Sequence, residues 1–249
     1  MKKILAFFMA FGLLMGTAYA NDKLRMGTEG AYAPWNFINE DGDVAGFEID
    51  LGNELCKRAG YDCEWVVNEW DTIIPNLVAG NYDTIIAGMS ITDERKQSIN
   101  FTQDYYPPDP SKFAVMAGAK IDFNNLKGQK IGVQGGTIQA AYVESNFAGN
   151  NTILSYETGD QSVADLAAGN VDVVLADGSF LKPIIDGSNG ALKLDGPDIL
   201  IGGGVGMGMR KGDNDLEMRM NKAIDSVKAD GTLDALIKKY FDAGPFYAN

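Results

Sequence analysis

The sequence predicts an α/β protein made of two similar lobes. An internal repeat is the first reason, because residues 77–83 and 166–172 each read as a helix end, a glycine stop and the start of an apolar strand. The second reason is that residues 26–28 and 131–133 both read as strands that run into glycine-bearing loops. A stiff Pro-Pro-Asp-Pro connector at 107–110 separates the two copies. Two α/β units joined by a connector are therefore expected.

The first twenty residues have the pattern of an export signal. Lys2 and Lys3 precede an apolar run at 4–15, and residues 18–20 supply the small side chains of a cleavage site. The run is too short to span a bilayer, and no later segment is apolar enough to do so. The residue after the cleavage site is not the cysteine that a lipid anchor needs. We therefore expect residues 1–20 to be a signal peptide, with the mature chain beginning at Asn21.

Cys56 and Cys63 are the two cysteines of the chain, seven positions apart. An exported protein enters an oxidising compartment, where a disulfide between them is the expected state. Closing so short a loop contributes about 2–3 kcal/mol, largely by restricting the unfolded chain.

Composition excludes several classes of function. The chain of 249 residues has a formal charge of −13, and removal of Lys2 and Lys3 with the signal peptide takes it to −15. Nucleic acid and anionic membrane surfaces are therefore poor partners. The chain contains no histidine, which removes His-based triads and nearly all zinc sites. No glycine-rich segment has the spacing of a dinucleotide or phosphate loop, so we expect neither a metal nor a cofactor.

Strands and helices alternate along the first half of the chain. Residues 24–28 alternate like a strand and lead into a turn-rich segment at 29–35 that holds two aromatic residues and a carboxylate. A hairpin-like turn at 39–42 precedes a helix that is ended by Gly60. Residues 61–67 alternate as the next strand.

A second helix is expected to follow, with Asp71 or Thr72 as its N-cap and Pro75 in its first turn, where proline is tolerated. A short buried strand at 84–86 comes next. It ends at residues 87–88, an Ala-Gly pair with almost no side chain, which leaves bare backbone open to a small ligand.

Arg95 stands out because of its place in the chain. Thr92 or Asp93 offers an N-cap, so a further helix would begin with Arg95 in its first turn. A cation is disfavoured at the positive end of a helix dipole, which favours an anionic partner for Arg95. A guanidinium binds a carboxylate through two parallel hydrogen bonds. The partner is either the carboxylate of a ligand or a nearby Asp or Glu in a surface salt bridge, and the residues alone leave both open.

The second half repeats this plan and ends in helices. The strand at 131–133 runs into the loop 135–137, and the strand of the second repeat ends at Asp177. In open α/β sheets, ligands sit beyond the carboxyl ends of strands, where these loops all lie. Alternating glycines at 202–209 read as a strand with one bare face that passes close to another backbone. Two amphipathic helices follow, with core stripes at Leu216, Met220, Ala223, Ile224, Val227, Leu233, Leu236, Ile237, Tyr240 and Phe241.

An ordered series of motifs makes the chain resemble a known family. Behind the export signal stand Glu-Gly-Ala-Tyr-Ala-Pro-Trp at 29–35, Gly-Phe-Glu-Ile-Asp-Leu at 46–51, Ser-Ile-Thr at 90–92 with Arg95, Gly-Gly-Thr at 135–137 and Lys-Lys-Tyr-Phe at 238–241. The chain resembles the periplasmic polar-amino-acid-binding proteins of ABC importers, especially the lysine/arginine/ornithine- and histidine-binding branch. The resemblance covers essentially the whole mature chain.

The resemblance implies the type II periplasmic-binding-protein fold, in which two lobes, each a mixed β-sheet flanked by helices, are joined by two hinge crossings. Residues 22–109 and 205–249 would form the first lobe and residues 110–204 the second. The crossings would fall near 110–113 and 203–205. The resemblance also implies a periplasmic monomer that closes over one amino acid and delivers it to the membrane permease subunits of an ABC importer.

The resemblance further implies how the backbone groups of the amino acid are held. Arg95 would clamp the α-carboxylate, helped by the amides of Ser90 and Thr137 at a helix start. Asp177 would accept the α-ammonium, together with the Gly88 carbonyl and the Ser90 hydroxyl. From the residues alone, Asp177 is equally well explained as a strand-end cap.

Four residues would read the side chain of the ligand. Tyr32 and Trp70 would sandwich a cationic stem, Glu29 would receive its distal charge, and Trp35 would complete this end of the site. The competing interpretation places Tyr32 and Trp35 in the core and Glu29 in a surface turn, but paired aromatics beside a carboxylate favour cation recognition. The remaining implied binding residues are Ala87, Met89, Gly135 and Gln139.

Three departures from the family pattern bear on the ligand. Residues 87–88 are Ala-Gly where the lysine and histidine binders have a Ser-Ser pair, which removes two hydroxyls and widens the cleft. Glu29 replaces the more usual aspartate, and Ile138 stands where a polar residue is common. Arginine fits best, with lysine, ornithine and histidine as further candidates. The alternative is an arginine-derived opine such as octopine or nopaline.

Two other classes of protein use the same fold. A periplasmic dehydratase would need an acid or base beyond the recognition groups, and Glu29 is the only spare candidate. The sensing domain of a receptor would need a membrane helix or a signalling module, and the sequence has neither pattern. We therefore expect a binding protein and not an enzyme.

Overall fold

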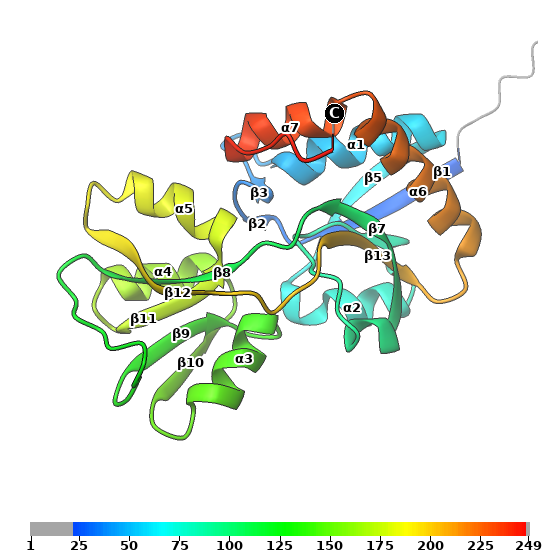
Figure 1. Cartoon of the computed structure of the whole chain (residues 1–249). Coiled ribbons are helices and arrows are strands. Elements are labelled where there is room, and N and C mark those ends of the chain that lie inside the picture. The colour runs from blue at the N-terminus through cyan, green and yellow to red at the C-terminus, as the bar shows by residue number, and fades with distance from the viewer. Residues whose placement is uncertain (1–21, 248–249) are drawn as a thin grey trace, which may run out of the picture.

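The computed structural model describes residues 22–247, so the predicted signal peptide and Asn21 lie outside the described residues. The described chain forms two lobes, each built around a five-stranded mixed sheet (Figure 1). The first sheet has the strand order β5-β1-β6-β13-β7, and the second has the order β10-β9-β11-β8-β12. A small three-stranded sheet, β2-β3-β4, belongs to the first lobe.

The first lobe is built from both ends of the described chain. Its large sheet consists of β1 (Asp22–Thr28), β5 (Tyr61–Val67), β6 (Thr84–Ile85), β7 (Ile99–Tyr106) and β13 (Val205–Arg210). Its small sheet consists of β2 (Ala31–Tyr32), β3 (Asn36–Ile38) and β4 (Val44–Ala45). Its helices are α1 (Phe47–Ala59), α2 (Trp70–Val78), the 3₁₀ turn η1 (Arg95–Gln97), α6 (Asn214–Ala229) and α7 (Thr232–Phe241).

The second lobe is one continuous stretch of chain. Its strands are β8 (Ser111–Met116), β9 (Lys130–Gln134), β10 (Thr152–Tyr156), β11 (Val173–Asp177) and β12 (Leu192–Ile199). Its helices are α3 (Ile138–Phe147), α4 (Gly159–Ala167) and α5 (Gly178–Gly187). Across residues 22–247, no helix combines the length and the apolar character that crossing a membrane requires.

The two large sheets have the same topology, as the internal repeat predicts. β1 pairs in parallel with β5 and β6, and β9 pairs in parallel with β10 and β11. An antiparallel strand follows in each sheet, β13 beside β6 and β8 beside β11. The glycine stops of the repeat, Gly80 and Gly169, have φ values of 84° and 76°, which only glycine adopts without strain. The predicted two-lobed α/β fold is confirmed.

Two segments carry the chain between the lobes. Residues 107–110 lead from β7 to β8, and residues 200–204 lead from β12 back to β13. They run side by side (Figure 1), because their ends pair through Val205 with Tyr106 and Ile199 with Ser111. The second segment is tightly packed, since a Cβ on Gly203 would lie 2.7 Å from the Ile91 carbonyl oxygen. The bare face predicted from the alternating glycines is therefore a close approach of backbones.

Helices cover both faces of the first sheet. α1, α6 and α7 pack together, and their apolar side chains share a core with Leu24 and Met26 of β1. α2 packs on the other face through Ile73 and Leu77. The first sheet is therefore covered by α1, α6 and α7 on one face and by α2 on the other.

The predicted disulfide and the end of α1 are both confirmed. Gly60 has a φ of 73° and provides the left-handed C-cap of α1. Cys56 in the last turn of α1 is bonded to Cys63 in β5, with their Cα atoms 6.1 Å apart. The disulfide therefore ties the helix to the edge strand that follows it.

Two local predictions are wrong. α2 begins at Trp70 after an extended Glu69, so Pro75 lies beyond the first turn rather than within it. The helix expected at Arg95 is the single 3₁₀ turn η1, whose N-cap is Glu94 rather than Thr92 or Asp93, although the Thr92 hydroxyl accepts a hydrogen bond from the Arg95 amide at 3.2 Å. The chain enters β7 at Ile99, which leaves no length for a longer helix. A helix dipole therefore does not explain the partner of Arg95.

Candidate functional site

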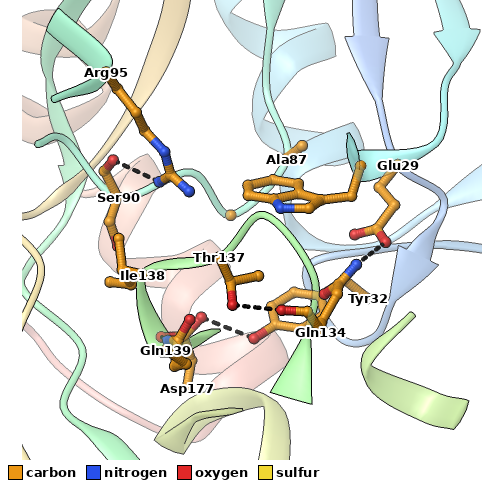
Figure 2. A pocket seen from close by; sticks show the side chains of 12 residues that line it. Glu29, Tyr32, Ala87, Ser90, Arg95, Gln134, Thr137, Ile138, Gln139 and Asp177 are labelled. Carbon is orange, nitrogen blue, oxygen red and sulfur yellow. Dashed lines mark hydrogen bonds between the residues drawn. The ribbon is translucent and has the colours of Figure 1, made fainter. Parts of the chain in front are cut away.

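A cavity of about 320 Å³ lies between the two lobes. Both lobes contribute to its wall (Figure 2). The lining residues are Glu29, Tyr32, Trp70, Ala87, Gly88, Ser90, Arg95, Gln134, Thr137, Ile138, Gln139 and Asp177.

The polar groups of the cavity stand at the carboxyl ends of parallel strands. Glu29 follows β1 and Gly88 follows β6 in the first sheet. Gln134 ends β9 and Asp177 ends β11 in the second sheet. The carboxyl ends of the parallel strands in both sheets therefore face one cavity, which is where open α/β sheets bind ligands.

Arg95 supplies a cation to the cavity. Its Nη1 donates to the Ser90 carbonyl oxygen at 2.9 Å, and its guanidinium carbon lies 5.2 Å from the centre of the Trp70 ring. Within residues 22–247 no carboxylate oxygen lies within 4 Å of it, so the alternative of a surface salt bridge to an Asp or Glu does not hold there. Burial lowers the pKa of Arg95 to about 10, which leaves it charged at neutral pH. In Figure 2 the guanidinium points into the cavity, and its remaining N–H groups are of the kind that bind a carboxylate.

The first turn of α3 also lies at the wall of the cavity. Thr137 is its N-cap, and the Thr137 hydroxyl accepts a hydrogen bond from the Ala140 amide at 3.1 Å. The same hydroxyl donates to the Gln134 carbonyl at 2.7 Å. Residues of this first turn line the cavity, so the positive end of a ten-residue helix is exposed to a ligand.

Asp177 supplies a carboxyl group from the second lobe. It accepts hydrogen bonds from the Tyr32 hydroxyl at 2.8 Å and from Gln139 Nε2 at 2.6 Å. Burial, followed by the nearby charge of Asp109, raises the pKa of Asp177 to about 7 despite the proximity of Arg95. A cationic group placed beside Asp177 would offset this loss of hydration.

Tyr32 links the two lobes across the cavity. Its ring stacks on Phe180 of α5, with ring centres 4.3 Å apart and planes 7° from parallel. On the first lobe it lies against Gly88, where a Cβ would be 3.4 Å from the ring. Gly88 also has a φ of 60°, so a side chain at this position would be strained.

Glu29 supplies a second carboxyl group, away from Arg95 in Figure 2. Its residue is only 6% exposed, and Oε1 accepts a hydrogen bond from Gln134 Nε2 at 2.6 Å. Burial raises the pKa of Glu29 to about 7, with smaller contributions from Asp160 and other carboxylates. The cavity thus holds two carboxyl groups and one guanidinium.

Glu48 fixes the loop that carries Gly88. It is fully buried at the start of α1, and its Oε1 accepts a hydrogen bond from the Gly88 amide at 2.7 Å. Its Oε2 accepts from Asn36 Nδ2 at 2.7 Å, and Asn36 Oδ1 in turn accepts from the Gly30 amide at 2.7 Å. One buried carboxylate therefore holds both first-lobe loops that approach the ligand.

The structure brings together most of the predicted binding residues but leaves out three. Trp35 is 1% exposed and packs in an aromatic cluster of the first lobe. Met89 is fully buried in the core beside α2. Gly135 faces Ser155, whose hydroxyl would lie 2.8 Å from a Cβ at this position.

Gln134 lines the cavity and was missed by the sequence reasoning. Its signal is the same as that of Asp177, a polar side chain at the last position of a buried strand before a loop. Within the described part of the chain, no group of three His, Cys, Asp or Glu side chains is arranged to hold a metal ion.

Comparisons with known proteins agree on one family. Residues 24–243 match the bacterial extracellular solute-binding proteins, family 3. A histidine-binding periplasmic protein of Salmonella typhimurium is 40% identical over 232 residues, which cover 88% of each chain. An L-arginine-binding protein of Pseudomonas aeruginosa is 35% identical over 266 aligned residues that cover 100% of both chains.

A solved structure gives the same result. A periplasmic protein of the His/Glu/Gln/Arg/opine-binding family from Silicibacter pomeroyi, in complex with lysine, is 51% identical to the chain. The two structures superpose with a TM-score of 0.83, and the match covers 90% of this chain and 100% of that one.

Proposed function

The chain belongs to the bacterial extracellular solute-binding proteins of family 3, and from this membership we propose that it captures a basic amino acid in the periplasm and delivers it to an ABC importer. One observation carries the proposal. The cavity is lined by one cation, Arg95, and by two buried carboxyl groups, Glu29 and Asp177. A basic amino acid has one anion and two cations, so each of its charges would meet an opposite charge.

The α-carboxylate is assigned to Arg95. The guanidinium keeps free donors after its bond to the Ser90 carbonyl, and the start of α3 at Thr137 adds backbone amides. The α-ammonium is assigned to Asp177, with the Gly88 carbonyl and the Ser90 hydroxyl as further acceptors. An ammonium beside Asp177 would favour the ionised form of a carboxyl group whose pKa is about 7 in the empty cavity.

The side chain of the ligand is assigned to Glu29, Tyr32 and Trp70. A planar guanidinium gains from both aromatic stacking and a carboxylate, whereas an ammonium is a compact charge that keeps more of its hydration. Arginine is therefore favoured over lysine, ornithine and histidine. Relatives named for histidine and arginine, and a neighbour solved with lysine, support a basic ligand as a class. The assignment does not extend to Trp35, Met89 or Gly135, which do not line the cavity.

Capture is proposed to occur by closure of the lobes about the two connecting segments, with lobe boundaries between residues 109 and 110 and between 204 and 205. A ligand whose ends contact different lobes stabilises the closed arrangement. Small-angle X-ray scattering is therefore expected to give a smaller radius of gyration with saturating arginine than without it. An unchanged radius, with binding established by calorimetry, would contradict closure on binding.

A panel of ligands tests the preference. Among the twenty amino acids, ornithine, citrulline and octopine, arginine is expected to give the largest thermal shift. Glutamine and glutamate should give almost none, because they would leave Glu29 unpaired or repelled in the closed site. A larger shift with octopine would favour the opine alternative. If glutamine or an aliphatic amino acid gave the largest thermal shift, the proposal that the pocket selects a cationic side chain would be contradicted.

The variant Glu29→Gln separates the side-chain contact from the rest of the site. It should weaken arginine far more than any neutral amino acid that binds measurably, because only a cationic side chain loses its carboxylate partner. Equal weakening of arginine and neutral ligands would show that Glu29 does not read the side chain.

A periplasmic dehydratase is the second candidate, because burial raises the pKa of Glu29 to about 7, in the range of a general acid. Incubation of the purified protein with prephenate and with arogenate tests it by product formation. Turnover that disappears in Glu29→Gln would put the enzyme first. If a preparation that binds arginine converts neither compound, the dehydratase is rejected and the binding function is the remaining proposal.

A further inference from the structure

Side-chain hydrogen bonds join the lobes at three places among residues 22–247, apart from those of the connecting segments. Two of them, Tyr32 to Asp177 and Gln134 to Glu29, use groups that line the cavity. The third runs from Trp35 Nε1 to the Ser179 hydroxyl at 2.9 Å, and neither residue lines the cavity. This bond joins the lobes without using any group assigned to the ligand.

Trp35 is held rigidly on the side of the first lobe. Its ring centre lies 5.6 Å from that of Phe47, 4.8 Å from that of Tyr106 and 4.8 Å from that of Phe241. A buried indole needs a partner for its single N–H donor. The partner is Ser179, which belongs to the other lobe.

Ser179 is held equally firmly on the side of the second lobe. It lies in the first turn of α5, and its amide and hydroxyl both donate to Asp109 Oδ2, at 3.1 and 2.6 Å. Asp109 belongs to the connecting segment 107–110. Because its proton is directed at Asp109, the Ser179 oxygen presents a lone pair to Trp35. First lobe, connecting segment and second lobe therefore meet at one hydroxyl group.

We propose that Trp35, Ser179 and Asp109 form a closure latch, a set of positioning residues that stabilises the closed arrangement without touching the ligand. The proposal rests on the proposed function, in which the ligand is captured by closure. A hydrogen bond is lost once donor and acceptor move apart by about 1 Å, so rotation of the lobes about the connecting segments breaks the Trp35–Ser179 bond. The latch then contributes only to the closed state.

A latch has a signature that a ligand contact lacks. When only the closed state holds the ligand tightly, the apparent Kd is the intrinsic Kd divided by the fraction of closed protein. Loss of the latch lowers that fraction by the same factor for every ligand. Loss of the latch should mainly raise koff, because the latch forms only after the lobes have met.

Ser179→Ala and Trp35→Phe test the latch by calorimetry with arginine, lysine and histidine. Each variant is expected to raise the Kd by roughly 3- to 10-fold, the effect of one neutral hydrogen bond, and by the same factor for all three ligands. The double variant should be no weaker than the weaker single variant, because both remove the same bond. Ser188→Ala is the matched control, since its hydroxyl bonds only within the second lobe, to Ile185 and Leu192, and it should leave every Kd unchanged.

Several results would overturn the latch. An unchanged Kd in Ser179→Ala, factors that differ between the three ligands, or additive effects in the double variant would each do so. If the wild type bound none of the three amino acids, the proposed function would fail by itself. The closed population of the unliganded protein, measured as a distance distribution between spin labels on the two lobes, would then decide the latch, which predicts a smaller closed population for Ser179→Ala than for the wild type and is refuted by equal populations.

Discussion

Arg95→Ala is expected to abolish measurable binding of amino acids while the protein remains folded. Among residues 22–247, Arg95 is the only cation that lines the cavity, so a bound α-carboxylate would be desolvated without a partner in the variant. Truncating one member of such a buried pair costs about 2–5 kcal/mol, or roughly 30- to 5,000-fold in Kd. The fold should tolerate the change, because Arg95 forms no ion pair within residues 22–247 and its burial is itself unfavourable. Calorimetry and thermal unfolding of the same preparation measure both effects.

Arg219→Ala is the matched control. The Arg219 guanidinium also lies over an aromatic ring, 3.7 Å from the centre of Tyr61, and also donates to a backbone carbonyl, that of Ala59 at 2.6 Å. It stands on α6, and it does not line the cavity. Arg219 also forms an ion pair with Asp22 at 3.7 Å, so Arg219→Ala is expected to lower stability and to leave the Kd unaltered. If Arg95→Ala bound arginine within a factor of three of the wild type, the assignment of the α-carboxylate would be wrong.

The architecture could be predicted because the same α/β sequence pattern occurs twice in the chain. A glycine stop followed by an apolar strand occurs at 80 and at 169, and each strand ends at the edge of the cavity. Local rules therefore predicted not only the strands but also the side of each sheet on which the polar groups of the cavity gather. Asp177 follows from its place at the end of β11, as Gln134 would have from its place at the end of β9.

The errors arise where tertiary packing decides the outcome. Trp35 and Tyr32 are three positions apart in one aromatic loop, and composition gives no means of telling which of them faces the cavity. Only the packing of Phe47, Tyr106 and Phe241 around Trp35 turns its ring into the core. At Arg95 the helix signals were sound, but the early start of β7 at Ile99 reduced the expected helix to a single turn. The argument that Arg95 has an anionic partner therefore depends on its position in the cavity wall, not on a helix dipole.

Affinity for arginine is expected to fall steeply as the pH is lowered from 8 to 5. Burial raises the pKa of Glu29 and of Asp177 to about 7 in the empty cavity, and both groups must be ionised to hold a doubly cationic ligand. Below pH 7 a proton must leave each group before the ligand binds, which weakens binding by up to about tenfold per pH unit for each one. Calorimetry should therefore give a Kd at least roughly 100-fold higher at pH 5 than at pH 8, which is the effect of one of the two groups alone.

The stability of the unliganded protein should change in the opposite direction. Glu29 has a pKa of about 7 when folded and 4.5 as its ordinary value, so between these values the folded state binds more protons than the unfolded state. The free energy of unfolding therefore falls as the pH rises from 4.5 to 7, by up to about 3 kcal/mol from this group. Glu48, with a pKa raised to about 6, acts in the same direction.

The variant Glu29→Gln tests whether Glu29 causes both pH dependences, that of the affinity for arginine and that of the free energy of unfolding. Glutamine stays neutral, so the variant should lose the Glu29 part of both pH dependences: its free energy of unfolding should fall less between pH 5 and 7, and its Kd for arginine should rise less below pH 7. At pH 8 the variant should be the more stable protein and the weaker binder, because the wild type there carries a buried charge that only a cationic ligand neutralises. Denaturant unfolding and calorimetry at four pH values measure both quantities. A wild type and a Glu29→Gln variant with parallel profiles would show that Glu29 is not the group that titrates on binding.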